Sequence, residues 1–414
     1  MRVIGIIAEY NPFHKGHGYL IAKAREEVGD PRAIVMSIMS GPFTQRGLPA
    51  IAPAHIRAKQ ALMCGSNVVL ELPFEYACAP ASEFAEGAVK SLMATGVVTD
   101  IAWGIEEDSI NLVEKLSDPS VYSDALYEET LKKSLAEGDS FPLANSKAVI
   151  AVLGEDDAEQ IRTAIKSPNT ILAVEYLKAI RKYGAKFKVH MIARCGQDYS
   201  DDSQDDTQEF NSASAIRAAI NSSTGTQSGI ASAVNGKIPD KAAAVMLSAI
   251  SRREFHPSDL DEYALRVITS PRDNISNIRF MGDGLSGYIS NVLDDLRTED
   301  ATFEGLSSKL STKHFTMPRI YRALTMMLLG IIENELDYDP MYIRVLGFDH
   351  DGRYCLKVMG KCAKLPIIHN HSDFLEKSEL AKTASVSLKA YDLSGVTMGI
   401  APGRSRDIPP VIVR

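Results

Sequence analysis

The chain has 414 residues, of which 45% are hydrophobic and 24% are charged, and its formal net charge at pH 7 is -8. This composition is that of an ordinary globular protein, and the length predicts roughly two to four domains. No stretch approaches the ~18 consecutive apolar residues of a membrane span, and an acidic chain lacks the overall basic signature of a nucleic-acid-binding protein. Any contact with RNA would therefore need a local basic patch.

The N-terminus and the cysteines indicate a cytoplasmic protein. Only Arg2 precedes the first short apolar run, and no small-residue cleavage site follows it, so we expect no signal peptide. The five cysteines form no Cys-x-x-Cys motif, which argues against a disulfide framework and a zinc site. His369 and His371 have no third clustered ligand, so we expect a solvated turn there and no metal held by the protein.

The first twenty residues form the pattern around which the chain is organised. Val3–Ala8 is a short apolar run rich in β-branched residues, which predicts a strand buried on both faces. Glu9–Phe13 predicts a loop, and the residues after it predict an amphipathic helix. His14 and His17, with Gly16 between them, therefore lie where a strand gives way to a helix. The N-terminus of a helix attracts phosphate, and glycine lets a ligand approach the backbone.

The next ninety or so residues predict a Rossmann-like, doubly wound parallel sheet, because apolar strand patterns alternate with helical ones. The expected strands and helices are, in order, Arg32–Met39, Ala54–Cys64, Val68–Leu72, Pro80–Thr95 and Asp100–Trp103.

Two loops fall at carboxyl ends of these strands, where such sheets bind ligands. Ser40–Pro49 contains Gln45 and Arg46, which could reach a phosphate or a carboxylate; a solvated surface turn is the alternative interpretation. Gly104 follows the fourth strand, where it could admit an adenine or a ribose to the backbone or serve only in a turn.

The region up to residue 220 predicts further helices and a fifth strand. Ser167-Pro168-Asn169 begins a helix that ends at Gly184, with Asn169 as a good N-cap. Arg194 directly follows the fifth strand. The fifth strand is expected at Phe187–Ala193, and two helices are expected earlier, at Leu112–Ser134 and Lys147–Ile165. An acidic mobile loop is expected after the strand, at Asp198–Glu209.

Ser212, Ser214 and Arg217 lie at the start of the next helix. Either serine would be a good N-cap, and Arg217 lies one turn into the helix. We regard the three as weaker candidates for contact with phosphate or substrate.

A polar stretch, Asn221–Gly229, is the expected linker between a catalytic domain, 1–220, and a mostly helical α+β domain, 230–414. In the second domain, Tyr342–Phe348 and Tyr354–Met359 predict a hairpin around an Asp-Gly turn. The expected helices are Lys241–Ser251, Gly284–Leu296, Phe303–Leu310, Met317–Ile332 and Phe374–Ala390.

One of these helices begins with a basic patch. Lys313, Arg319 and Arg322 lie in the stretch KHFTMPRIYR, which contains no acidic residue. Arg319 and Arg322 are three residues apart and share a helix face, so we expect them to contact RNA phosphates. A solvated helix start is the alternative interpretation.

Three stretches together resemble one family. They are Ile6–His17, Ser40–Gly47 and Ser167–Ala173, and they are similar to the bacterial tRNA(Met) cytidine acetate ligase family, which belongs to the nucleotidyltransferase superfamily with a His-x-Gly-His motif. The similarity is dense over about the first 220 residues and thinner beyond, where Arg319–Arg322 and Tyr342–Gly347 also match.

The resemblance implies an ATP-dependent acetate ligase. Such an enzyme forms acetyl-adenylate from acetate and ATP, releases pyrophosphate, and transfers the acetyl group to N4 of the wobble cytidine of elongator tRNA(Met), giving N4-acetylcytidine. ATP, acetate and tRNA are the implied partners, with no membrane, no assigned oligomeric state and the need for Mg²⁺ left open. His14, His17 and Lys15 are the implied catalytic residues, because attack on the α-phosphate builds charge for which one preorganised donor contributes ~3 kcal/mol.

The ATP site that the resemblance implies is carried over by position. It comprises Ile7, Ala8, Glu9, Tyr10, Asn11, Pro12, Phe13, His14, Lys15, Gly16, His17, Gly18, Tyr19, Leu20, Gly104, Asn169 and Arg194. The chain departs from the family near the nucleotide base, since Trp103 replaces a smaller aromatic residue and Ile105 replaces a serine.

Two other functions compete with this interpretation. The first is a nucleotidyltransferase that joins a nucleotide to a small phosphorylated metabolite and releases pyrophosphate. The size of the second half and its basic helix count against it. The second is a nucleotide-sensing RNA-binding protein without catalysis, against which the intact His14 and His17 count.

Overall fold

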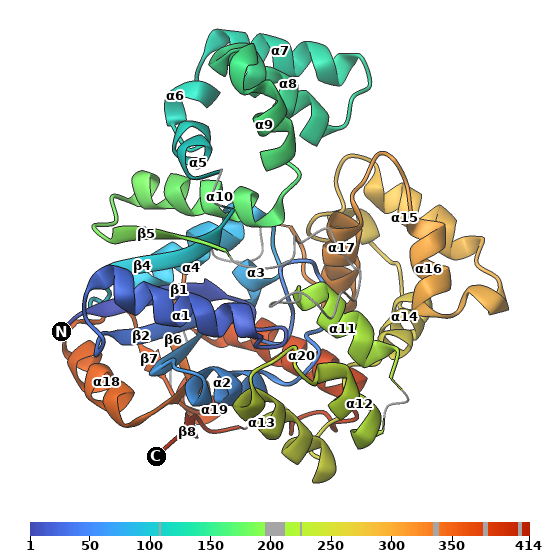
Figure 1. Ribbon diagram of the computed structural model, residues 1–414. Coiled ribbons are helices and arrows are strands. Elements are labelled where there is room, and N and C mark those ends of the chain that lie inside the picture. Colours follow the sequence, from blue (N-terminus) through green and yellow to red (C-terminus); the bar gives the residue numbers. More distant parts are fainter. Residues whose placement is uncertain (107–108, 195–211, 224–225, 334–338, 376–379, 405–407) are drawn as a thin grey trace.

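The computed structural model describes residues 1–106, 109–194, 212–223, 226–333, 339–375, 380–404 and 408–414. Its centre is one sheet with the strand order β5-β4-β1-β2-β3-β6-β7, in which β8 pairs with β6 (Figure 1). The strands are β1 (Val3–Ala8), β2 (Ile34–Ser40), β3 (Val68–Leu72), β4 (Asp100–Ile105), β5 (Lys188–Ala193), β6 (Ile343–Phe348), β7 (Ile367–Ile368) and β8 (Val411–Ile412).

The strands β5, β4, β1, β2 and β3 are parallel, as the sequence predicts. The chain runs outward from β1 to β3 and then returns to the other side of β1 for β4 and β5. The strand order thus reverses between β1 and β4, and α/β sheets bind ligands beyond the carboxyl ends of their strands at such a point.

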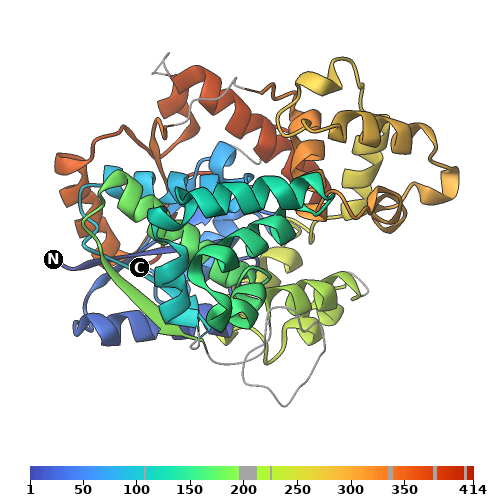
Figure 2. The same ribbon diagram turned by 90° about the horizontal axis from the view of Figure 1, so that it is seen from above.

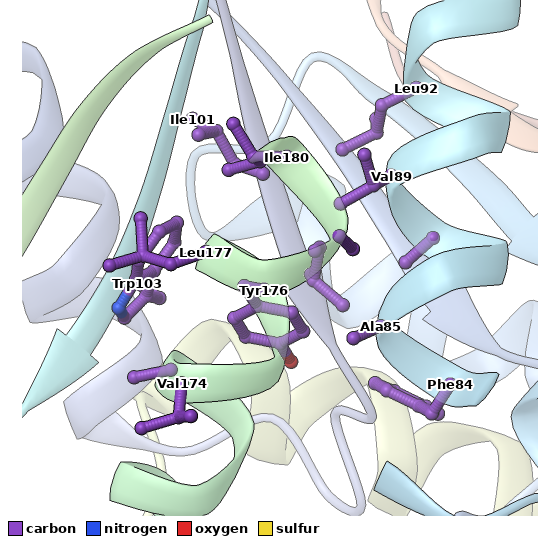
Figure 3. Close-up of a cluster of buried hydrophobic side chains, with 14 of the residues drawn as sticks. Phe84, Ala85, Val89, Leu92, Ile101, Trp103, Val174, Tyr176, Leu177 and Ile180 are labelled. Carbon is purple, nitrogen blue, oxygen red and sulfur yellow. The ribbon is translucent and has the colours of Figure 1, made fainter. Parts of the chain in front are cut away.

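Helices cover both faces of the sheet, which explains why its strands are almost continuously apolar. On one face lie α4 (Ala81–Ala94) and α10 (Pro168–Tyr183), and on the other lie α1 (Lys15–Val28) and α2 (Ala54–Met63) (Figure 1). Figure 3 shows the core between α4, α10 and β4, where the rings of Trp103 and Tyr176 lie 5.4 Å apart. This core fixes the position of α10 over the carboxyl end of β4.

Five further helices form a layer beyond α10 (Figures 1 and 2). The predicted helix over 112–134 is divided into three, because Asp118 and Asp124 accept hydrogen bonds from backbone N–H groups and cap new helices. The five are α5 (Ile110–Leu116), α6 (Pro119–Tyr122), α7 (Ala125–Ala136), α8 (Phe141–Leu153) and α9 (Ala158–Ala164), with a 3-10 turn at Glu155–Asp157.

The second half of the chain packs around the sheet as well as extending it. β6 pairs antiparallel with β3, and α13 contacts α2. The buried residues of α14–α17 form one core with Phe43 and Phe74. The division of the chain into two domains at 220–230 stays a prediction.

The helices around the sheet that have not yet been given are α3 (Phe74–Ala77), α11 (Ala213–Asn221), α12 (Gln227–Val234), α13 (Asp240–Ser251), α14 (Leu260–Thr269), α15 (Leu285–Asp294), α16 (Phe303–Leu310) and α17 (Met317–Leu329), with 3-10 turns at Ile275–Asn277 and Thr298–Asp300.

The predicted hairpin after β6 is wrong, because the residues after Phe348 form α18 (His350–Cys362). The carboxylate of Asp349 accepts a hydrogen bond from the backbone N–H of Gly352 over 2.7 Å and so caps the helix. A Cβ on Gly352 would lie 1.9 Å from the carbonyl oxygen of Asn67. The Asp-Gly pattern therefore marks a helix N-terminus that packs closely on the chain, and not a turn.

Two other predicted segments change, and one cannot be compared. Part of the predicted linker is helical, because α12 begins at Gln227 and contacts α11. The predicted last helix is replaced by α19 (His371–Leu375) and α20 (Ala381–Thr397). The predicted acidic loop, Asp198–Glu209, lies outside the described residues. No helix in the described part of the chain is long and apolar enough to cross a membrane.

Candidate active site

A pocket opens at the carboxyl ends of β1, β4 and β5, beside the reversal of strand order. The loop after β1, the loop after β2 and parts of α1, α4, α10 and α11 surround it. Its lining residues are Ile7, Ala8, Glu9, Tyr10, Asn11, His14, Gly16, His17, Tyr19, Leu20, Gln45, Arg46, Phe84, Trp103, Gly104, Pro168, Asn169, Leu172, Tyr176, Ile192, Ala193, Arg194, Ala213 and Arg217. Most residues of the predicted ATP site are thus brought together.

The two histidines stand at the N-terminus of α1. The backbone N–H of His14, the N-cap, donates to Nδ1 of His17 over 3.1 Å. The two rings stack with centroids 3.6 Å apart, and Tyr10 packs edge-on against His17 at 4.9 Å. Because Nδ1 of His17 accepts a hydrogen bond, a neutral ring carries its proton on Nε2, which then becomes a donor.

Both imidazoles are neutral in the free protein. Burial, reinforced by the charges of Arg194 and Arg217, lowers the pKa of His14 to about 3. Burial, followed by the influence of His14 and Arg194, holds the pKa of His17 well below its ordinary value. Each neutral ring still carries one N–H group. The pair can therefore donate hydrogen bonds to phosphoryl oxygens without first releasing a proton.

Arg217 fastens the loop before the histidines. Its NH1 donates to the carbonyl oxygen of Asn11 over 2.8 Å, and its NH2 donates to Oγ of Ser214 over 3.0 Å. Ser212 is the N-cap of α11, where its hydroxyl accepts a hydrogen bond from the N–H of Ala215. Of the three predicted candidates, Arg217 alone is a lining residue, and the two serines support α11 and Arg217.

Three side chains converge on Glu106, which follows β4. Its carboxylate accepts hydrogen bonds from Nδ2 of Asn169 at 3.1 Å, Oγ1 of Thr170 at 3.2 Å and NH1 of Arg194 at 3.2 Å. The N-cap of α10 is Ser167, so the prediction that Asn169 caps this helix is wrong. Asn169 and Arg194 line the pocket instead, and Glu106 holds them in place.

Replacing Arg194 by alanine is expected to weaken ATP binding by about 1.5–3 kcal/mol, which is roughly 10–150-fold in Kd, because a charge-assisted hydrogen bond is lost. Isothermal titration of ATP measures the effect. Arg181→Ala is the matched control, since Arg181 pairs with Glu114 away from the pocket lining. Equal Kd values for Arg194→Ala and the parent protein would refute the contact.

The loop after β2 is held from two sides. The backbone N–H of Gln45 donates to Oε1 of Glu9 over 2.7 Å, and NH1 of Arg322 donates to the carbonyl oxygen of Gln45 over 3.0 Å. Gly47 has φ of 92°, and a Cβ on it would lie 2.3 Å from the backbone nitrogen of Arg322. The loop thus packs tightly on α17 and brings Gln45 and Arg46 to the pocket.

A buried arginine that the sequence analysis missed joins this loop to the histidine loop. Arg57 on α2 is fully buried and donates to the carbonyl oxygens of Glu9, Ser40, Gly41 and Ala52. Burial lowers the pKa of Arg57 to about 10, so the guanidinium remains charged at neutral pH. No local sequence signal distinguishes such a residue from a solvated helical arginine.

Glu106, Phe84 and Tyr176 were also missed. Phe84 and Tyr176 lie on the α4 and α10 side of the pocket, where Trp103 joins them (Figure 3). Their apolar periodicity is that of core residues, so the pattern gives no separate signal. The position of Glu106, two residues after Gly104 at the end of a strand, could have indicated a residue of the site.

Some residues of the predicted ATP stretch are not lining residues. They are Pro12, Phe13, Lys15 and Gly18. Phe13 is fully buried, and its ring lies 5.4 Å from that of His17, so it supports the imidazole. Lys15 is the first residue of α1 and is partly exposed.

The predicted basic patch is only partly at the surface. Lys313 is exposed, and NH2 of the partly exposed Arg319 lies 2.8 Å from the carboxylate of Asp283. Arg322 is only 8% exposed and binds the loop after β2. The prediction that Arg322 contacts RNA is therefore wrong, because its guanidinium points into the interface between α17 and that loop.

In the part of the chain that the structure describes, no three His, Cys, Asp or Glu residues lie close enough together to hold a metal ion. The side chain of His371 lies outside that part. Among the described lining residues Glu9 is the one carboxylate, and Mg²⁺ prefers six oxygen ligands. The lining residues that the structure describes therefore do not form a magnesium cage.

The fold and the site together define the class of protein. A doubly wound sheet with paired histidines between β1 and α1, at a helix N-terminus beside the strand-order reversal, has the arrangement of a nucleotidyltransferase-type α/β protein.

Comparison with known proteins specifies the family. The model of the HIGH Nucleotidyl Transferase family matches residues 1–399. The chain is 33% identical over 408 residues to the tRNA(Met) cytidine acetate ligase of Syntrophomonas wolfei subsp. wolfei, covering 95% of this chain and 94% of the relative. It is 34% identical over 398 residues to the protein of that name from Fervidobacterium nodosum, covering 92% and 87%. The chain belongs to the HIGH nucleotidyl transferase family, and the resemblance drawn from the sequence is confirmed.

Solved structures agree with the fold. The crystal structure of Thermotoga maritima TmcAL (apo, form I) matches with a TM-score of 0.87 at 28% identity over 100% of both chains. The structure of that protein bound with alpha-thio ATP matches with a TM-score of 0.85 at 29% identity, again over 100% of both chains. The predicted fold class is thereby confirmed.

Proposed function

We propose that this protein is an ATP-dependent ligase that forms acetyl-adenylate from acetate and ATP and transfers the acetyl group to N4 of the wobble cytidine of elongator tRNA(Met). The observation that carries this proposal is the stacked pair of neutral histidines at the N-terminus of α1, inside a pocket that also presents Arg194 and Arg217. The names of the full-length relatives support the choice of substrates.

The proposed first half-reaction uses the groups at the N-terminus of α1. Attack of the acetate oxygen on the α-phosphorus places extra negative charge on the phosphoryl oxygens. The N–H donors of His14, His17 and the α1 N-terminus would stabilise that charge, while Arg194 and Arg217 add positive charge. Pyrophosphate leaves, and a mixed anhydride of acetate and AMP remains in the pocket.

The second half-reaction needs an orientated amine more than further covalent chemistry. The mixed anhydride is already activated, so the main requirement is that the cytidine N4 atom lies close to the carbonyl carbon. A single nucleotide turned out of an RNA loop fits this requirement, because single-stranded loops present their bases to protein pockets. Such an enzyme would meet its tRNA in the cytoplasm.

The direct test is the mass of the product. The full-length protein is incubated with ATP, acetate and elongator tRNA(Met), and the nucleosides are then analysed by mass spectrometry. N4-acetylcytidine that requires both ATP and acetate is the expected result. Pyrophosphate release with a phosphorylated metabolite, and none with acetate, would favour the other type of nucleotidyltransferase.

Charge reversal at the exposed part of the basic patch tests the route of tRNA binding. Lys313→Glu with Arg319→Glu is expected to weaken binding and to reduce the slope of log K against log salt by about one unit for each lost phosphate contact. Acetate-dependent pyrophosphate exchange without tRNA should survive. Lys132→Glu on α7 is the control, because its exposed ammonium pairs with Glu128 in the outer helical layer. An unaltered tRNA affinity across the salt series would exclude this surface.

A further inference from the structure

The second half-reaction leaves one proton unassigned. The cytidine amine loses a proton when it becomes an amide, and the groups lining the pocket differ greatly in their ability to accept it. Burial and nearby arginines lower the pKa of His14 to about 3. Burial, followed by the influence of His14 and Arg194, holds the pKa of His17 well below its usual range. Neutral imidazoles of this kind are poor bases.

Among the lining residues that the structure describes, Glu9 is the single carboxylate. It directly follows β1, five residues before His14, and shares the pocket with Arg46, Arg194 and Arg217. A carboxylate in this position would repel acetate and the phosphates of ATP. The binding of anionic substrates therefore does not explain why a carboxylate lies in this pocket, and Glu9 should have another role.

The side chain of Glu9 is held in one orientation. Oε1 accepts the backbone N–H of Gln45 over 2.7 Å, and the carbonyl oxygen of Glu9 accepts NH1 of Arg57 over 2.7 Å. No hydrogen bond to the other carboxylate oxygen, Oε2, is present among the described residues. One oxygen is therefore fixed, and the other remains able to accept a proton from a ligand.

Two neighbours of Glu9, Tyr176 and Arg57, keep their protons at neutral pH. Burial, followed by the charge of Glu9, raises the pKa of Tyr176 on α10, so the phenol stays protonated. Arg57 stays cationic. These neighbours are donors or inert at neutral pH, and none competes with the carboxylate for a proton.

We propose that Glu9 accepts the proton of the cytidine N4 amine during acetyl transfer, an inference that rests on the proposed function. The N4 lone pair attacks the carbonyl carbon of acetyl-adenylate and forms the C–N bond, while the carbonyl π electrons move to oxygen. Oε2 of Glu9 takes one N4 proton. The tetrahedral intermediate then re-forms its C=O bond and expels AMP by breaking the C–O bond. Glu9 later releases the proton to water.

The chemistry of cytidine explains why such a base is useful. The N4 lone pair is delocalised into the ring, so the amine is a weak nucleophile. Once N4 has attacked, its N–H bonds become strongly acidic, and a nearby carboxylate removes the proton before the intermediate collapses back. A positioned general base of this kind contributes about 10²–10⁴-fold to a rate.

Measuring the two half-reactions separately tests whether Glu9 acts in acetyl transfer and not in adenylate formation. The full-length Glu9→Gln variant keeps an oxygen that accepts the N–H of Gln45 but cannot accept the amine proton at neutral pH. The protein is first loaded with ATP and acetate in the presence of pyrophosphatase, and tRNA(Met) is then added for a single turnover. We expect the rate of N4-acetylcytidine formation to fall by about 10²–10⁴-fold. Acetate-dependent pyrophosphate exchange, measured without tRNA, should fall far less.

The matched control is Glu27→Gln, which changes an exposed glutamate on α1 and should leave both rates unchanged. Three results would overturn the proposal for Glu9: transfer at the parent rate, equal losses in both half-reactions, or a loss in exchange that added Mg²⁺ restores. The last result would instead assign Glu9 to metal binding. If the parent protein exchanges pyrophosphate but never acetylates tRNA, the proposed function itself fails, and that failure is visible without any Glu9 variant.

Discussion

Replacing His14 or His17 by alanine should reduce acetate-dependent pyrophosphate exchange by about 10²–10³-fold, because each change removes a preorganised donor from the α-phosphate. The two rings stack at 3.6 Å and are linked through the backbone N–H of His14. They act as a unit, so the double variant should lose little more than either single one. Exchange of labelled pyrophosphate into ATP is the measurement.

A matched control separates catalysis from folding. His350→Ala on α18 removes an imidazole whose side chain is 94% exposed, and it should retain full exchange. The His14 and His17 variants should unfold at nearly the same urea concentration as the parent. Near-normal exchange in them would show that the histidines are not at the reacting phosphate. Early unfolding would indicate that the pair mainly stabilises the helix N-terminus.

The protonation of the pair gives a related expectation. The pH profile of kcat/KM reports groups of the free enzyme, in which the pKa of His14 is about 3 instead of the ordinary 6.5. The histidines should therefore produce no inflection near pH 6.5. An acid limb there that disappears in the His14→Ala variant would contradict the neutral state.

Removing Arg344 should destabilise the protein by about 3–5 kcal/mol, because a buried carboxylate would lose its cation. NH1 of Arg344 on β6 lies 3.1 Å from Oε2 of Glu71 on β3, and these side chains are 5% and 0% exposed. The hydroxyl of Tyr391 donates to the same oxygen over 2.9 Å. Burial raises the pKa of Glu71, and Arg344 opposes this effect. Urea unfolding of Arg344→Ala measures the loss.

Two further variants interpret that loss. Arg353→Ala removes an exposed arginine from α18 and should change stability by no more than about 0.5 kcal/mol. The double variant Glu71→Leu with Arg344→Met should recover most of the loss, since a buried ion pair can often be exchanged for apolar residues. An unchanged unfolding midpoint for Arg344→Ala would mean that the pair contributes nothing.

The parallel half of the fold was predictable because its signals are local. Each buried strand is a short apolar run, and Asn11-Pro12 followed by His14 marks the change from strand to helix. The same locality explains the errors. Asp349 and Asp351 lie three residues and one residue before Gly352, a pattern typical of a turn, whereas contact between Asp349 and Asn67 selects a capped helix.

The remaining features depend on partners that are distant in the sequence. In the sequence, Arg322 and Arg57 both resemble surface cations. In the structure, the loop around Gln45 covers Arg322, and four carbonyl oxygens surround Arg57. Glu106 acquires its role only when Asn169 and Arg194 reach it. Such contacts belong to the tertiary structure and leave no periodic pattern in the chain.

The pairing of β6 with β3 also has a consequence during translation. Leu72 ends β3, and Ile343, the first residue of β6, is synthesised about 270 residues later. At about 5–20 residues per second, the outer edge of β3 stays unpaired for roughly 14–54 s on the ribosome. An open apolar edge invites pairing with other nascent chains, and a charged residue on it discourages this. Glu71 is buried in the folded protein, where it pairs with Arg344. Before Arg344 is synthesised, the charge of Glu71 would protect the growing chain from aggregation.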